Sequence, residues 1–272
     1  MDYLAREGAP ISAALWKQID DIVIGEARKH MVCRRFLDIY GPLGAGATHV
    51  PVETIEADEV FENNMGRVVG RPLAELPLLY QDFAILWRTL AEADANGRPL
   101  DLSAAAAAAQ RSSKQEDDLI LFGNKKLGVE GLFTAANAKK LKRGDWSTGE
   151  AAFQDVAHAI AYMSNSSMLG RYALILSPEI YLQLQRLQPN VGLMEIDRIK
   201  SLVGDRVYPV GAFGQGKAAL VCAEPQYMDL AVGMDLSAGY LEQKDFNHYF
   251  RIAETVALRI KNPKAIVQFE LE

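Results

Sequence analysis

The stretch of sequence that decides the fold is Arg34-Arg35-Phe36-Leu37-Asp38-Ile39-Tyr40-Gly41-Pro42-Leu43-Gly44-Ala45-Gly46. It follows a segment with the apolar periodicity of an amphipathic helix, and its second half is rich in glycine. A phosphate-binding loop would continue with Gly-Lys-Ser/Thr, which is missing here, and Pro42 lacks the backbone N–H that such a loop uses. The stretch therefore indicates a structural element rather than a catalytic motif.

Length and composition describe an ordinary globular chain. Its 272 residues suffice for one large domain or two small ones, and 49% of them are hydrophobic. The net charge of −6 argues against a nucleic-acid binder, which usually carries a basic patch. Cys33 and Cys222 form neither a disulfide framework nor a zinc-binding pattern, which fits a reducing cytoplasm. No apolar run reaches the roughly 18 residues of a membrane span, and the N-terminus does not resemble a signal peptide. We therefore expect a cytoplasmic chain without a membrane partner.

The flanking segments are expected to form a helix and an extended arm. Residues 11–30 have helical apolar spacing, which fits either a helix packed on its own core or one that keeps a second apolar edge for a partner. Residues 41–72 contain weak strand signals around Val50–Ile55 and Val60–Phe61, with turn chemistry at Asn63–Gly66. Such a hairpin has little apolar mass and is poorly stable alone. It makes sense if another subunit covers it.

The rest of the chain mixes helices and strands, which predicts an α+β fold. We expect helices over 101–122, 150–163, 178–187 and 194–202, and strands over 172–176, 218–222, 250–261 and 265–271. The 250–261 strand alternates, so one face should be buried and the other wetter. Glu254 interrupts its apolar face and needs a partner or an exposed end.

No motif indicates an enzyme, an intrinsic cofactor or a metal site. Gly211–Lys217 fits the GxxxxGK spacing, but Ala218 stands where Ser or Thr would bind magnesium, and a strand is expected to follow. The four histidines form no HExxH motif, and no GxSxG occurs. Glu116, Asp117 and Asp118 point in different directions on a helix, so we interpret them as solvated or interface-pairing residues rather than as a catalytic pair.

Four further segments, in order along the chain, join residues 34–46 in a resemblance to one family. They are Glu116–Gly123 followed by Gly128–Leu132, Gly170–Ser177, Gly233–Tyr240 and Asn262–Pro263. The ordered set resembles the encapsulins, which are bacterial and archaeal shell proteins with the HK97-type capsid fold. The resemblance implies a peripheral domain (1–46, 92–136 and 225–272), an extended loop (47–91) that reaches over a neighbour, and an axial domain (137–224).

The same resemblance implies two functional sites. A groove for a cargo protein's C-terminal targeting peptide would involve Arg34, Phe36, Asp38, Asp235 and Leu236. Phe36 and Leu236 suit apolar pockets, whereas Arg34 and Asp38 suit charge-assisted bonds. The alternative is an internal Arg34–Asp38 pair with Phe36 in the core. The tip of the axial domain would line a five-fold pore, with a loop formed by Arg186, Gln188, Pro189, Asn190 and Gly192.

The function implied by the resemblance is a container. Sixty identical subunits, or a multiple, would close around a cargo enzyme, with a ferritin-like iron-storage protein first and a dye-decolorizing peroxidase second. Iron or haem would then come with the cargo, since the shell needs no cofactor of its own. A prophage major capsid protein that packages DNA is the alternative with the same fold, and a stand-alone enzyme comes third.

Overall fold

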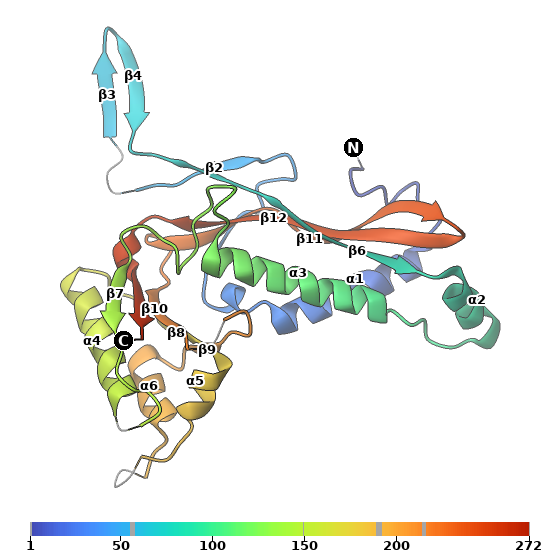
Figure 1. Ribbon diagram of the computed structural model, residues 1–272. Helices are drawn as coiled ribbons and strands as arrows, with labels where there is room; N and C mark the ends of the chain where they lie inside the picture. Colours follow the sequence, from blue (N-terminus) through green and yellow to red (C-terminus); the bar gives the residue numbers. More distant parts are fainter. Residues whose placement is uncertain (1, 55–57, 149, 189–191, 214–215, 272) are drawn as a thin grey trace.

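Two β-sheets organise the chain, and the α+β class is confirmed. The computed structural model describes residues 2–54, 58–148, 150–188, 192–213 and 216–271. The first sheet has four strands in the order β1-β11-β12-β6, and the second has five in the order β7-β13-β10-β8-β9. Figure 1 shows the two sheets in separate parts of the molecule, with the helices α1 and α3 beside the first and α4, α5 and α6 around the second.

The four-stranded sheet is built on a long hairpin. Its two central strands are β11 (Met228–Lys244) and β12 (Asn247–Ile260), flanked by β6 (Leu78–Ile85) and the short β1 (Ile39–Tyr40). The helices α1 (Ala13–His30) and α3 (Ser103–Phe122) pack against it. The buried side chains between them include Trp16, Ile19, Val23, Phe83, Phe250, Ala105, Ala108 and Ala109. The buried alanines lack bulk, which lets α3 approach α1 closely.

The face of β12 that we predicted to be wetter is buried as well. Small side chains such as Ala257 lie on it and form a cluster with Ala231, Val50 and Leu76. Val50 belongs to β2 (His49–Pro51) and Leu76 follows β5 (Leu73–Glu75), the two strands at the root of the arm. The prediction was wrong because the arm root, which lies far earlier in the chain, covers this face.

The five-stranded sheet combines segments from three parts of the chain. It contains β7 (Lys139–Lys142), β13 (Ile266–Glu270), β10 (Ala218–Cys222), β8 (Tyr172–Leu176) and β9 (Val207–Pro209). The structure therefore places the last strand of the range 225–272 beside segments of the range 137–224. A domain boundary drawn between the two sheets would therefore lie near Asn262–Pro263, between β12 and β13.

Three helices accompany this sheet: α4 (Ala151–Asn165), α5 (Pro178–Gln183) and α6 (Glu195–Val203). The hydroxyl of Ser177 accepts a hydrogen bond from the N–H of Ile180 and caps α5, as its sequence predicted. Helix α5 ends at Gln183, four residues earlier than predicted, because the chain turns and Leu187 forms a β-bridge with Met194. A strand, β10, follows the phosphate-loop-like Gly211–Lys217.

The arm is a two-stranded hairpin that stands away from both sheets (Figure 1). It consists of β3 (Asp58–Glu62) and β4 (Met65–Val69), and all ten of these residues are exposed. Asn63 and Asn64, the two turn residues, both have positive φ, which is the geometry that tight hairpins favour. Five of the exposed side chains are apolar: Val60, Phe61, Met65, Val68 and Val69. The remaining elements are helix α2 (Trp87–Asn96) and two 3-10 turns, η1 (Cys33–Arg35) and η2 (Pro263–Ala265).

A buried ion cluster connects the arm root to the four-stranded sheet. The guanidinium of Arg259 donates to both carboxylate oxygens of Asp229 at 2.6 Å, and Lys261 lies 2.8 Å from the same carboxylate. Arg259 also donates to the carbonyl oxygen of Pro51 at 2.9 Å. One buried carboxylate therefore pairs with two cations, and one of these, Arg259, also binds the start of the arm.

We expect Asp229→Asn to destabilise the protein by about 3–5 kcal/mol, because it leaves Arg259 and Lys261 buried without an anion. The matched control is Glu150→Gln, which breaks the more exposed pair of Glu150 with Arg198 and should cost less than about 1 kcal/mol. Denaturant unfolding of both variants measures the difference. Equal costs would contradict the assignment of Asp229 as a structural anion.

Candidate functional site

The segment after helix α1 is fixed to helix α3 by a carboxylate. Asp117 accepts hydrogen bonds from the backbone N–H groups of Val32 and Cys33 at 3.0 and 2.9 Å. These bonds hold the turn η1, which carries Arg34. Burial raises the pKa of Asp117, although the two N–H bonds oppose that shift.

Arg34 forms ion pairs with three carboxylates. Its Nε and Nη2 donate to the carboxylate of Glu116, with the shortest contact at 2.6 Å. The same Nη2 donates to Glu254 at 2.8 Å, and Nη1 donates to Asp235 at 2.7 Å. The guanidinium thereby joins the N-terminal segment to α3, β12 and β11.

The interpretation of Glu116 and Asp117 as solvated or interface-pairing residues was wrong. Glu116 is fully buried and Asp117 nearly so. Neighbouring residues on a helix diverge, so these two carboxylates approach the N-terminal segment at different points, one at the backbone and one at the Arg34 side chain. Only Asp118 remains partly exposed, where it pairs with Lys114.

The predicted groove residues fall into two groups. Arg34 and Asp235 are in direct contact, and Leu236 follows Asp235 with its half-buried side chain against the core between α1 and the sheet. Phe36 belongs instead to the main core: it is 6% exposed, and its ring centroid lies 5.5 Å from that of Tyr208. Phe36 is thus buried, as the alternative expected, whereas Asp38 does not pair with Arg34; the assignment of these residues to a cargo groove stays a prediction.

Asp38 is held by the second sheet. Its carboxylate forms an ion pair with Arg171, whose Nε also donates to Glu224 at 3.0 Å. Arg171 donates to the carbonyl oxygen of Ala223 as well. Asp38 thus links the N-terminal segment to β8 and to the residues after β10.

Sequence reasoning missed the partners of these residues. Glu254 had a signal, since it interrupts an apolar alternation, and Arg34 is the partner that it needs. Glu116 and Arg171 carried no local signal, because their partners lie 82 and 133 residues away in the chain.

The predicted pore residues are described only in part. Pro189 and Asn190 lie outside the described residues, and Gly192 has a positive φ of 71°. Arg186 forms an ion pair with the buried carboxylate of Glu195, which also accepts a hydrogen bond from Gln188 at 2.9 Å. These two side chains anchor the base of the loop, and its assignment to a pore stays a prediction.

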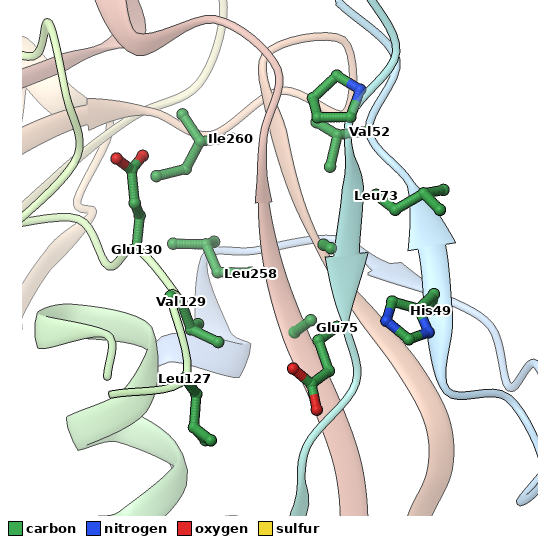
Figure 2. A pocket seen from close by; sticks show the side chains of 13 residues that line it. His49, Val52, Leu73, Glu75, Leu127, Val129, Glu130, Leu258 and Ile260 are labelled. Atoms are coloured by element: carbon green, nitrogen blue, oxygen red, sulfur yellow. The ribbon is translucent and has the colours of Figure 1, made fainter. Parts of the chain in front are cut away.

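One surface hollow lies between the arm root, the turn Leu127–Glu130 and the end of β12 (Figure 2). His49 and Glu75 are paired across β2 and β5 on one side of it, and Glu130 lies on the other side. Across the described residues, no three His, Cys, Asp or Glu side chains are placed to hold a metal ion. Within the same part of the chain, no helix is both long and apolar enough to cross a membrane.

Comparison with known proteins identifies the class first. The virus-like particle of Pyrococcus furiosus matches with a TM-score of 0.76 and 23% identity over 94% of this chain and 99% of that one. The fold is the HK97-like capsid fold, which phage capsids share. The chain thus has the fold of the capsid class.

The family follows from sequence similarity. The family Linocin_M18, described as "Encapsulating protein for peroxidase", matches residues 1–257. The type 1 encapsulin shell protein EncA of Myxococcus xanthus is 38% identical, over 99% of this chain and 96% of its own length. A ferritin-like-encapsulin shell fusion protein of Pyrococcus furiosus is 28% identical over 82% of this chain and 62% of its own length. The chain belongs to the encapsulins: it is a structural shell protein of a cargo-enclosing nanocompartment, and not an enzyme.

We expect Phe36→Ala to destabilise the subunit by about 3–5 kcal/mol, because it removes a buried ring from the core. Leu241→Ala is the matched control, since Leu241 is exposed and its truncation should change stability by less than about 0.5 kcal/mol. Urea unfolding followed by tryptophan fluorescence measures both. If the Phe36→Ala subunit is as stable as the control, Phe36 is not a core residue and its assignment to the groove is favoured.

Proposed function

We propose that sixty copies of this chain, or a multiple of sixty, close into an icosahedral shell, and that cargo docks inside through a C-terminal targeting peptide. The observation that carries the assembly proposal is the arm. Its hairpin exposes five apolar side chains, and Phe61 alone is 72% exposed. A two-stranded hairpin of this kind is at best marginally stable in water.

A second subunit is the occupant that fits this surface. The hairpin stands away from its own sheets (Figure 1), while its root is fixed through Val50, Leu76 and the Arg259–Pro51 hydrogen bond. A fixed root and an uncovered tip suit a head-to-tail contact between copies. Repeated around a closed symmetry, such contacts end in a shell rather than in an open filament.

Replacing Phe61 and Met65 together by serine tests the arm. Both side chains are exposed in the subunit, so its fold should persist, whereas the shells should give way to small oligomers. Glu62→Gln is the control, because it changes a polar residue of the same hairpin. Gel filtration with light scattering separates the outcomes, and intact shells from the serine variant would refute the arm contact.

The cargo site is proposed around Arg34, Asp235 and Leu236. Asp235 is the exposed end of the ion network, and Leu236 offers a half-buried apolar side chain beside it. Two further residues would hold the segment that carries this surface: Phe36 by packing against Tyr208, and Asp38 by its ion pair with Arg171. A peptide could contact Asp235 and Leu236 without disturbing the buried carboxylates.

Docking of one peptide should be weak. Burial of two or three apolar side chains contributes roughly 1.5–3 kcal/mol each, whereas ordering a free peptide costs about 2–5 kcal/mol. An oligomeric cargo with several tails gains from the high effective concentration of the remaining tails after the first has bound. This favours a ferritin-like iron-storage cargo, in line with the fusion in the Pyrococcus furiosus relative. A dye-decolorizing peroxidase ranks second, in line with the family description. Iron or haem in purified, loaded particles would distinguish them.

Cargo loading should fall when Asp235→Ala and Leu236→Ala are combined, because both exposed contacts of the proposed site are lost. Leu241→Ala lies on the same strand and controls for a change in β11 alone. Co-expression with a reporter that carries the targeting peptide, followed by gel densitometry of purified particles, gives the loading. Assembled shells with wild-type loading would place the groove elsewhere.

A further inference from the structure

The ion network below the proposed cargo surface has an imbalance of charge. One guanidinium, that of Arg34, faces the carboxyl groups of Glu116, Glu254 and Asp235. Glu116 and Glu254 have no exposed side-chain surface, while Asp235 reaches solvent. Among the described residues, every ion pair of these three groups is made with Arg34. Two buried carboxylates therefore depend on one cation.

The geometry brings the two buried carboxyl groups together. Oε2 of Glu116 and Oε2 of Glu254 accept from the same Nη2 atom of Arg34, at 2.6 and 2.8 Å. Because both oxygens lie within hydrogen-bonding distance of one nitrogen atom, the two carboxyl groups are close neighbours. Two carboxyl groups can hydrogen-bond to each other only when one of them carries a proton, since ionised carboxylates are acceptors only.

Of the two buried carboxyl groups, Glu254 has fewer hydrogen bonds to Arg34, which favours a proton on Glu254. Glu116 accepts three hydrogen bonds from Arg34, whereas Glu254 accepts one. The other oxygen of Glu254, Oε1, is buried without a hydrogen-bond partner among the described residues. Burial raises the pKa of Glu254 well above its usual value, and the charge of Glu116 raises it further.

The remaining neighbours do not supply a second cation. On the N-terminal segment, Cys33 is buried, and Asp117 of α3 is engaged by backbone N–H groups. On β11 the facing group is Asp235, and on β6 the residue opposite Glu254 is the apolar Leu79. Loss of the proton would thus add a second buried negative charge with no new partner.

We propose that Glu116 and Glu254 share one proton and form an alkaline-sensitive latch, which holds the segment after the N-terminal helix against the sheet. Opening the latch exposes Glu254 to water, where an ordinary carboxyl group ionises near pH 4.3. Above that pH, opening releases one proton, so the population of the open form increases as the pH rises. This dependence ends at the raised pKa of the closed form, where both forms are ionised.

Hydrogen exchange in assembled particles tests the latch. In wild-type protein, the protection of the amides at Val32, Cys33 and Phe36 should fall by up to about tenfold per pH unit across the neutral range, after correction for intrinsic exchange. Glu254→Gln keeps the shape and a donor toward Glu116 but cannot ionise. Its protection should be independent of pH and higher than that of wild type at alkaline pH. Glu150→Gln, at a partly exposed pair elsewhere, should behave as wild type.

A second measurement needs no folded variant. The infrared spectrum of wild-type particles at neutral pH should contain the C=O stretch of a protonated carboxylic acid that disappears on alkaline titration. Absence of this band at neutral pH, or the same pH dependence of protection in Glu254→Gln as in wild type, overturns the proposal. Flat protection in wild type across this range does so as well.

Discussion

The structure depends on a hairpin that cannot bury its own apolar side chains. Within the described residues, strands β3 and β4 pair only with each other, and all of their residues are exposed. The hydrophobic effect favours removal of that surface from water, and within one subunit nothing in the described chain covers it. The proposed contact between subunits would cover this surface, in keeping with the membership of the chain in a family of shell proteins.

The rest of the subunit gives this arm a firm base. The root strands pack on β12 through small side chains. Arg259 donates a hydrogen bond to the Pro51 carbonyl oxygen, and Asp229 compensates the charge of Arg259. On the opposite face of the same sheet, α1 and α3 fill the space with aromatic and alanine side chains. The root of the arm is thus held by a part of the sheet that is covered on both faces.

The N-terminal segment connects the two sheets. Arg34 ties it to the four-stranded sheet, while Asp38 ties it to Arg171 and Phe36 packs against Tyr208 in the five-stranded sheet. A change in this short segment can therefore alter both sheets. The proposed cargo surface lies over the Arg34 network, so the two proposals, peptide docking and a shared proton, concern the same few residues.

Local sequence patterns predicted the elements well and their partners poorly. The hairpin turn at Asn63–Asn64, the cap at Ser177 and the end of α3 at Gly123 follow from the preferences of single residues. Burial of Glu116 and of the second face of β12 depends on segments far away in the chain, which periodicity cannot reveal. The groove residues came from family resemblance, and burial then divided them into a surface pair and a core residue.

Electron microscopy of the purified protein, with its mass by light scattering, tests the central claim most directly. Sixty copies of the 30.0 kDa chain would give a particle of about 1.8 MDa, and a larger shell would give a multiple of that mass. The proposed assembly should give uniform closed particles with one of these masses. A discrete species of 30.0 kDa, with the arm exposed to solvent and the chain still folded, would contradict it.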